Sequence, residues 1–324
     1  MRQSSLKSLW MLLAVCLFAP CRTACAASGD EPPRFEVPAA SAGPLLFVAY
    51  GDTRFSKRDD IANASARRAL VQRIAGEHPA AILIGGDLVY EGSSADDYET
   101  FKSETSEWAK QEIAVFPALG NHEFKGCTQD ATPCLENWWT AFDSLPLRPH
   151  RWYSVTLGPT LLVIVLDSDA PLKPASEQRV WFETQLANTD SRVKFILITL
   201  HYPPVRDPIY PTMRDEKEIA RYLGHKAGSL HAQVVVIGSH VHNYERYKKG
   251  GVTYLVSGGG GAKPVPAFRM FGELSKLKTS VNFHYVRFTL ENDQLTGTMV
   301  RFDADDRTGN PWSEPDHFEI RAKR

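Results

Sequence analysis

The sequence has 324 residues, of which 43% are hydrophobic and 23% are charged. These shares are ordinary for a globular protein and exclude a chain too polar to bury a core. Basic and acidic residues nearly balance, with a formal net charge of −1 at pH 7, which excludes a general electrostatic attraction to nucleic acid or to anionic membranes. We therefore expect no nucleic-acid partner, and an anionic ligand would need a local positive site such as bound metal.

The first 26 residues have the pattern of a secretory signal peptide. A basic start is followed by an apolar run over residues 9–20, which is too short to span a bilayer comfortably. Ala24-Cys25-Ala26 then matches an A-x-A cleavage site. The alternative is a retained membrane anchor. We expect cleavage near Ala26 and an exported protein, periplasmic or secreted, with no membrane contact beyond export.

Residues 27–43 are rich in Ala, Ser, Pro and Gly and are predicted to form a flexible leader. Of the five cysteines, only Cys127 and Cys134 follow the expected cleavage site. They are close in sequence, with turn-forming residues between them. In an oxidising compartment this spacing indicates a small loop disulfide, and two free thiols are the alternative.

From residue 44 onward, predicted buried strands alternate with predicted helices. Short continuous apolar runs are typical of strands buried on both faces, and stretches with apolar residues at helical spacing lie between them. The predicted strands are residues 45–50, 80–84, 113–117, 161–166, 193–200 and 233–237, and the predicted helices are residues 62–75, 96–110, 176–187 and 215–226. This alternation indicates an α/β architecture.

The last third of the chain follows a different pattern. Residues 252–257, 284–290 and 295–302 are predicted to be strands joined by short turns, without helices between them. We expect a second, more antiparallel sheet that packs face to face with the first, with helices outside both. Because no linker separates the two parts, we expect a single domain over residues 44–324.

Metal-ligand residue types follow five of the predicted buried strands. Ligands of α/β sheets bind beyond the carboxyl ends of the strands, so we expect these side chains to converge. Each signal is modest alone, because Gly-Asp and Asn-His are also common in turns. Two imidazoles at period 2 are a stronger signal, because they point to one face. The residues are Asp52, Asp87, Asn121, His122, His201, His240 and His242.

Five segments carry a resemblance to a known family. They are Gly51-Asp52, Gly86-Asp87-Leu88-Val89-Tyr90, Gly120-Asn121-His122-Glu123, His201, and His240-Val241-His242-Asn243-Tyr244-Glu245-Arg246. In this order they resemble the calcineurin-like metallophosphoesterases, and within them the purple acid phosphatase group, for which Gly-Asp-x-x-Tyr with His-x-His-x-Tyr-Glu-Arg is fairly specific. The resemblance implies a four-layer α/β/β/α sandwich and hydrolysis of phosphate esters at two metal ions.

The resemblance also implies how the ligands divide between the two ions. The first ion would be held by Asp52, Asp87, Tyr90 and His242, and the second by Asp87, Asn121, His201 and His240, with Asp87 bridging. A tyrosinate and carboxylates are hard donors that suit Fe(III), whereas imidazoles and an amide oxygen suit divalent iron, zinc or manganese. The alternative for Tyr90 is a core tyrosine with its hydroxyl bonded.

Two further residues are candidates for contact with substrate. His122 resembles the family's catalytic histidine, which implies transition-state stabilisation or proton donation to the leaving oxygen; its alternative is a loop histidine bonded to backbone. Arg54 stands where the superfamily often has His. It is either a guanidinium fork for phosphate or a surface arginine paired with Asp59 or Asp60. Ser239 is a second departure from the family pattern, because Gly commonly precedes the first histidine of the His240-Val241-His242 pair.

The leading interpretation is hydrolysis of phosphate monoesters, in which metal-activated water attacks the phosphorus of a small phosphorylated substrate. A phosphodiesterase or nucleotidase on the same metal centre is the second interpretation. A non-catalytic metal- or phosphate-binding protein of the same fold is the third. A zinc hydrolase acting on amides is disfavoured by Tyr90 and by the Asp–Asn–His pattern. The sequence predicts no oligomeric state.

Overall fold

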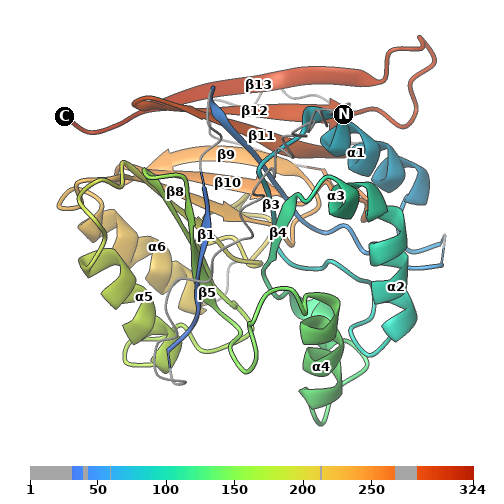
Figure 1. The fold of residues 1–324 in the computed structure, drawn as a ribbon, viewed down its shortest axis with the longest axis horizontal. Helices are drawn as coiled ribbons and strands as arrows, with labels where there is room; N and C mark the ends of the chain where they lie inside the picture. Colours follow the sequence, from blue (N-terminus) through green and yellow to red (C-terminus); the bar gives the residue numbers. More distant parts are fainter. Residues whose placement is uncertain (1–30, 39–42, 59, 212–213, 267–282) are drawn as a thin grey trace, which may run out of the picture.

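The computed structural model describes residues 31–38, 43–58, 60–211, 214–266 and 283–324. Two mixed β-sheets pack face to face, with helices on the outside of both (Figure 1). Helices α5 and α6 lie on the side of one sheet, and α1, α2 and α3 lie on the side of the other (Figure 1). The predicted α/β/β/α sandwich is confirmed.

The seven-stranded sheet has the strand order β1-β5-β6-β7-β8-β10-β9. Neighbouring strands in this sheet are parallel, except for the antiparallel pairs β5–β6 and β9–β10. The strands are β1 (Arg34–Val37), β5 (Tyr153–Leu157), β6 (Leu161–Val165), β7 (Phe195–Thr199), β8 (Gln233–Gly238), β9 (Tyr244–Lys249) and β10 (Val252–Ser257). Its central parallel strands are buried on both faces, which explains their continuous apolar sequences.

The six-stranded sheet has the order β13-β12-β11-β2-β3-β4. Its strands are β2 (Leu45–Tyr50), β3 (Ala81–Ile84), β4 (Ala114–Pro117), β11 (Phe283–Glu291), β12 (Gln294–Phe302) and β13 (Trp312–Arg321). Strands β2, β3 and β4 are parallel, and β11 joins them through an antiparallel pairing with β2. One expectation is corrected here: residues 252–257 pair with β8 of the seven-stranded sheet and do not join the other strands of the last third.

The four predicted helices lie close to where the sequence predicts them. The helices of the structure are α1 (Ala64–Glu77), α2 (Ala95–Glu104), α3 (Ser106–Lys110), η1 (Asn121–Phe124), α4 (Thr132–Ala141), α5 (Glu177–Ala187) and α6 (Arg214–Lys226). Of these, η1 and α4 were not predicted. The helix predicted over residues 96–110 is divided at Thr105, whose hydroxyl donates to the carbonyl oxygen of Phe101 at 2.7 Å. A side chain that binds the preceding turn competes with the regular helix ladder, which is consistent with a break at this point.

The two faces of the seven-stranded sheet belong to different cores. Along β7, Phe195 and Leu197 face the core between the sheets, whereas Ile196 and Ile198 face the helices α5 and α6. This alternation is the period-2 geometry of a strand. The sheet is therefore anchored on both sides, which fixes the loops at its carboxyl edge.

The predicted flexible leader over residues 27–43 is wrong for residues 34–37. These residues form β1, which pairs in parallel with β5 at the sheet edge, and Phe35 is buried against Phe116 and Tyr153. A strand of four residues among prolines and alanines gives no long apolar run, so its packing decides its structure. The rest of the leader up to residue 30, residues 39–42 and the predicted signal peptide lie outside the described residues.

Two smaller observations complete the fold. Cys127 and Cys134 are joined by a disulfide with a Cα–Cα distance of 6.2 Å, so the predicted loop bridge is confirmed. Among the described residues, none of the helices has both the length and the apolar character that crossing a membrane requires.

Candidate metal centre

The predicted metal ligands lie on loops at the carboxyl ends of strands from both sheets. Asp52, Asp87 and Asn121 follow β2, β3 and β4, and the histidines follow β7 and β8. The parallel arrangement of β2–β4 and of β7–β8 brings these strand ends to the same edge within each sheet. Because the two sheets pack face to face, five separate loops meet at one site.

One group of ligand atoms surrounds the Nε2 atom of His201. This atom lies 3.1 Å from Asn121 Oδ1, 3.2 Å from His240 Nδ1 and 3.3 Å from Asp87 Oδ1. The other ring nitrogen of His201 lies 3.0 Å from the carbonyl oxygen of Gly85, which orients the ring and leaves Nε2 as a lone-pair donor. These are the four residues predicted for the second metal.

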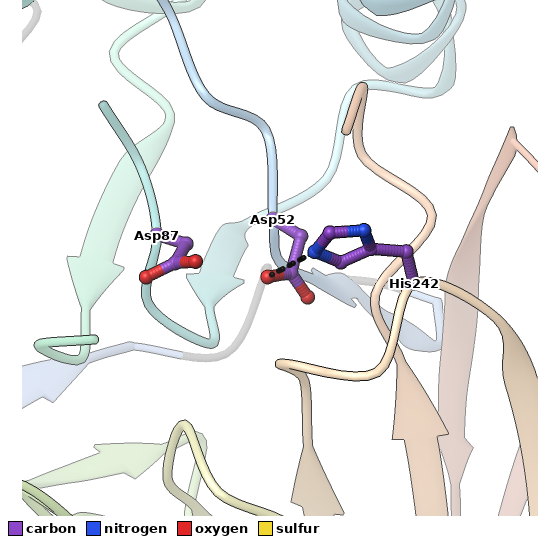
Figure 2. A group of neighbouring side chains, drawn as sticks. All are labelled: Asp52, Asp87 and His242. Carbon is purple, nitrogen blue, oxygen red and sulfur yellow. Dashed lines mark ion pairs between the residues drawn. The ribbon is translucent and has the colours of Figure 1, made fainter. Parts of the chain in front are cut away.

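A second group lies on the other side of Asp87. Asp52, Asp87 and His242 offer ligand atoms that all lie within 4.8 Å of one another. Figure 2 shows the imidazole of His242 directed at Asp52, with its Nε2 atom 3.6 Å from Asp52 Oδ1. The Nδ1 atom of His242 lies 2.9 Å from the carbonyl oxygen of Lys263, which again orients the ring. These three residues belong to the set predicted for the first metal.

The state of Asp52 fits a cation at this position. Its side chain is fully buried, and neither of its carboxylate oxygens has a hydrogen-bond partner among the residues that the structure describes. Burial, with the negative charge of Asp87, raises the pKa of Asp52 well above its usual range. A buried carboxylate without donors is unfavourable, and a bound metal ion offsets that penalty.

The histidines are electrostatically suited to be ligands. Burial lowers the pKa of His201, and it lowers the pKa of His240 to about 3 and of His242 to about 4. Imidazoles with such pKa values are neutral near pH 7, which is the form that binds metal. The residues present therefore fit a pair of metal ions that share Asp87.

Residues 45–244, more than half of the chain, match the family of calcineurin-like phosphoesterases. The chain belongs to this family. No curated protein matches the chain.

Solved structures with the same fold include two phosphatases. The purple acid phosphatase PPD1 from yellow lupin (Lupinus luteus) seeds is 18% identical with a TM-score of 0.65, and the match covers 87% of this chain and 55% of that chain. A dimetal phosphatase from Danio rerio is 14% identical with a TM-score of 0.56, over 87% of this chain and 100% of that chain. GAP50 of Plasmodium, described as the anchor in the inner membrane complex, is 16% identical with a TM-score of 0.56. The match covers 87% of this chain and 90% of that chain.

The backbone of this calcineurin-like phosphoesterase is strained at three of the predicted metal ligands. Asp52, Asp87 and His240 adopt positive φ angles of 57°, 52° and 65°. Such conformations are uncommon for residues other than glycine and concentrate at functional sites. Ser239, which departs from the family's usual glycine, is not among the residues with positive φ. Its side chain fills the space beside Gly51, where an added Cβ would clash with it.

Glu123 is a residue whose role the sequence did not reveal. It is 1% exposed, and its carboxylate accepts hydrogen bonds from the backbone N–H groups of Gly120, Asp87 and Leu88 at 2.7–2.9 Å, and of Val89 at 3.3 Å. Burial, followed by the charge of Asp87, raises the pKa of Glu123 to about 8. Glu123 therefore ties the loop of the bridging aspartate to the loop of Asn121. The local signals are its position three residues after Gly120, within η1, and its place in the family-like segment Gly120-Asn121-His122-Glu123.

His122 and Tyr90 lie side by side at the edge of the site. The Nδ1 atom of His122 lies 2.5 Å from the carbonyl oxygen of Tyr90, and its Nε2 atom lies 3.9 Å from Asp87 Oδ2. The Tyr90 ring lies beside that of His122, and the Lys125 ammonium lies 3.2 Å from the Tyr90 ring centre. Within the described part of the chain, no hydrogen bond involves the Tyr90 hydroxyl. Ligation by Tyr90 stays a prediction.

Arg54 lies at the metal centre and not on an outer surface. Its Nη2 atom lies 3.2 Å from Asp87 Oδ2, and its side chain is 17% exposed. Its Nε atom is buried without a hydrogen-bond partner among the described residues. The alternative of a surface pairing with Asp60 is not observed, because Arg54 pairs with Asp87 and Asp60 pairs with Arg58; Asp59 lies outside the described residues.

Proposed function

We propose that the protein is a binuclear-metal hydrolase of phosphate monoesters. The observation that carries this proposal is the position of Asp87 between two groups of ligand atoms. His201 Nε2 lies 3.3 Å from its Oδ1 atom, and Asp52 and His242 lie within ligand distance on the other side. A shared carboxylate between two buried ligand sets is the arrangement expected of two-metal hydrolases.

The residues divide between the two ions as the family resemblance implies. Asp52, Asp87, Tyr90 and His242 would hold Fe(III), and Asp87, Asn121, His201 and His240 would hold iron, zinc or manganese. When bound, such a pair supplies a nucleophilic water at neutral pH and offsets the negative charge on the phosphoryl oxygens. The purple acid phosphatase fold of the lupin protein supports this assignment.

Two side chains of the protein would act on the substrate directly. The bond from His122 Nδ1 to the Tyr90 carbonyl oxygen fixes the imidazole, so that Nε2 is left to contact the leaving oxygen. Beside Asp87, Arg54 has a buried Nε–H that no acceptor among the described residues satisfies. A guanidinium in this position binds a phosphoryl oxygen by a charge-assisted hydrogen bond.

We also propose that the protein is exported and acts in the periplasm or outside the cell. The disulfide between Cys127 and Cys134 supports an oxidising compartment. The signal-peptide pattern over residues 1–26 points the same way.

Hydrolysis of two chromogenic esters tests the proposal. We expect metal-loaded protein to hydrolyse 4-nitrophenyl phosphate, and we expect a chelator or the variant Asp87→Asn to abolish this activity. Faster hydrolysis of bis(4-nitrophenyl) phosphate than of the monoester would favour the diesterase instead. Absence of chelator-sensitive activity toward both esters would contradict catalysis and favour a binding protein; GAP50, described as an anchor, is an example with this fold.

A further inference from the structure

A compact pocket adjoins the metal centre. It has a volume of about 250 Å³, and its walls come from the loops after β7 and β8 and from residue 265. The lining residues are Arg206, Tyr210, Pro211, His240, Val241, His242 and Val265. Because His240 and His242 belong both to the pocket and to the ligand sets, an ester with its phosphate at the metals would place its leaving group here.

Arg206 supplies the charged group of this pocket. Its side chain is 8% exposed, its Nε atom donates to the carbonyl oxygen of Tyr210 at 3.2 Å, and its Nη2 atom donates to that of Pro211. Its Nη1 atom is buried and has no hydrogen-bond partner among the described residues. A buried donor without an acceptor is unfavourable, so a ligand that reaches Nη1 through a small shift of the guanidinium and accepts its hydrogen bond would bind with a gain in free energy.

The charge on Arg206 is retained despite its burial. Burial lowers the pKa of the guanidinium, but the carboxylates of Glu216 and Glu245 oppose this effect, and an arginine remains protonated in proteins. Nevertheless, no ion pair within 4 Å joins Arg206 to a carboxylate among the described residues. Glu216 and Glu245 therefore act on the guanidinium from beyond ion-pair distance, and no described carboxylate occupies its donors.

The remaining walls restrict what can enter. Pro211, Val241 and Val265 are apolar, and the Tyr210 hydroxyl already donates to the carbonyl oxygen of Pro266 at 2.8 Å. A volume of about 250 Å³ is smaller than the roughly 300–1,000 Å³ of sites for drug-sized ligands. The pocket suits a single ring or a short chain with one anionic end.

We propose that this pocket is the leaving-group subsite, and that it selects compact phosphate monoesters whose leaving group carries a second anion, bound by Arg206. The anion is a carboxylate or a further phosphate, either of which accepts hydrogen bonds from a guanidinium. This inference rests on the proposed phosphatase function. A solely structural Arg206 would need only the two bonds that hold residues 210 and 211.

A matched pair of substrates tests the subsite. The phosphate monoesters of 4-hydroxybenzoate and of its methyl ester have nearly the same shape, but only the first carries a second anion. We would measure kcat/KM for both esters and express preference as their ratio, in wild type, in Arg206→Gln and in Arg221→Gln. Arg221 is a suitable control because its side chain is 63% exposed on α6 and pairs with Glu218.

We expect the preference for the anionic ester to fall about tenfold or more in Arg206→Gln, because one charge-assisted hydrogen bond is lost, and to persist in Arg221→Gln. Inhibition by inorganic phosphate, which has no leaving group, should change by less than about twofold. If the preference of folded Arg206→Gln is reduced by less than threefold relative to wild type, the proposed subsite is overturned. If wild type hydrolyses neither ester, the proposed function itself fails.

A second variant covers the case in which Arg206→Gln does not fold. Val265→Phe keeps Arg206 and fills the pocket from its apolar wall. We expect this variant to raise KM for both aryl esters about tenfold while inhibition by inorganic phosphate is retained. Unchanged KM for both esters would show that the leaving group does not bind in this pocket.

Discussion

Glu123 determines how two ligand loops are held together. One carboxylate oxygen accepts from Gly120 and Asp87, and the other accepts from Leu88 and Val89. A glutamine keeps the shape of the side chain but turns one of these acceptors into a donor. The two N–H groups facing that donor would then lose their partner within a fully buried site.

We therefore predict that Glu123→Gln lowers the free energy of unfolding by about 2–5 kcal/mol, because each buried N–H left without an acceptor costs about 1–3 kcal/mol. Chemical denaturation at pH 9, above the Glu123 pKa of about 8, measures this change with the carboxylate ionised. Glu99→Gln is the matched control, because the Glu99 side chain is 66% exposed, and we expect it to change stability by less than about 0.5 kcal/mol. Equal stabilities of the two variants would contradict the role given to Glu123.

Tyr90 leads to a spectroscopic prediction. If its hydroxyl ligates iron, iron-loaded protein should show a visible absorption band from charge transfer between tyrosinate and Fe(III), and Tyr90→Phe should lack it. Tyr202→Phe is the control, because the Tyr202 ring lies 4.6 Å from that of the ligand candidate His240 without being a predicted ligand. Colourless protein that contains its full complement of iron would contradict ligation by Tyr90.

Most of the candidate ligands could be recognised at the scale of single residues, because each is a metal-binding residue type directly after a buried strand. The structure brings Asp52, Asp87 and His242 together on one side, and Asn121, His201 and His240 on the other. Glu123 and the positive φ angles could not be predicted, since both depend on how separate loops pack. The surroundings of Arg54 could not be predicted for the same reason.

At the scale of elements, strands are easiest to predict from sequence where both of their faces are buried. Strands such as β6 and β7 are buried on both faces and were predicted almost to the residue from their apolar runs. The strands β1, β9 and β13 lie at sheet edges and were missed. The buried strand β5 was also missed, because its sequence YSVTL alternates polar with apolar residues and gives no continuous apolar run. Half-exposed strands such as β9 (YERYKK) and β13, which contains Pro315, carry charged residues or proline, as edge strands commonly do.

Strands β9 and β13 are joined across the two sheets by Asp316. Its carboxylate accepts from the Tyr244 hydroxyl at 2.7 Å and from Arg246 Nε and Nη2 at 2.8 and 3.0 Å. Burial alone would raise the pKa of Asp316, but these hydrogen bonds outweigh it and the pKa is lowered. Asp316 is therefore a link between the edge strands of the two sheets.

We predict that Asp316→Asn destabilises the protein by about 1–3 kcal/mol at pH 7, because charge-assisted hydrogen bonds are weakened. Since the pKa of Asp316 is lower in the folded state, its contribution is present above the unfolded pKa of about 3.9 and is lost as the pH falls through the folded pKa. Denaturation curves at several pH values measure the difference from wild type. A difference that stays constant below pH 4, or an equal effect of the exposed Asp305→Asn, would contradict this link.

At the scale of the whole molecule, the metal centre joins loops from both sheets. Asp52, Asp87 and Asn121 come from the six-stranded sheet, and the histidines come from the seven-stranded sheet. Ions that bind the folded state but not the unfolded state should therefore stabilise the entire sandwich. The same ions would also offset the free-energy cost of burying the Asp52 carboxylate without hydrogen-bond donors.

We predict that removal of metal with a chelator lowers the unfolding free energy by about 3–4 kcal/mol, which corresponds to ions present at 100–1,000 times their Kd. Thermal unfolding with and without chelator measures this loss. In Asp87→Asn the loss should be much smaller, because the shared ligand is weakened for both ions. A chelator effect of the same size in wild type and Asp87→Asn would mean that metal binds elsewhere.

Anomalous diffraction from crystals of the metal-loaded protein tests the shared metal centre most directly. We predict two anomalous peaks separated by about 3.5–4 Å, with Asp87 between them, one beside Asp52 and His242 and the other beside His201 and His240. A single peak, or peaks remote from Asp87, would contradict the binuclear centre.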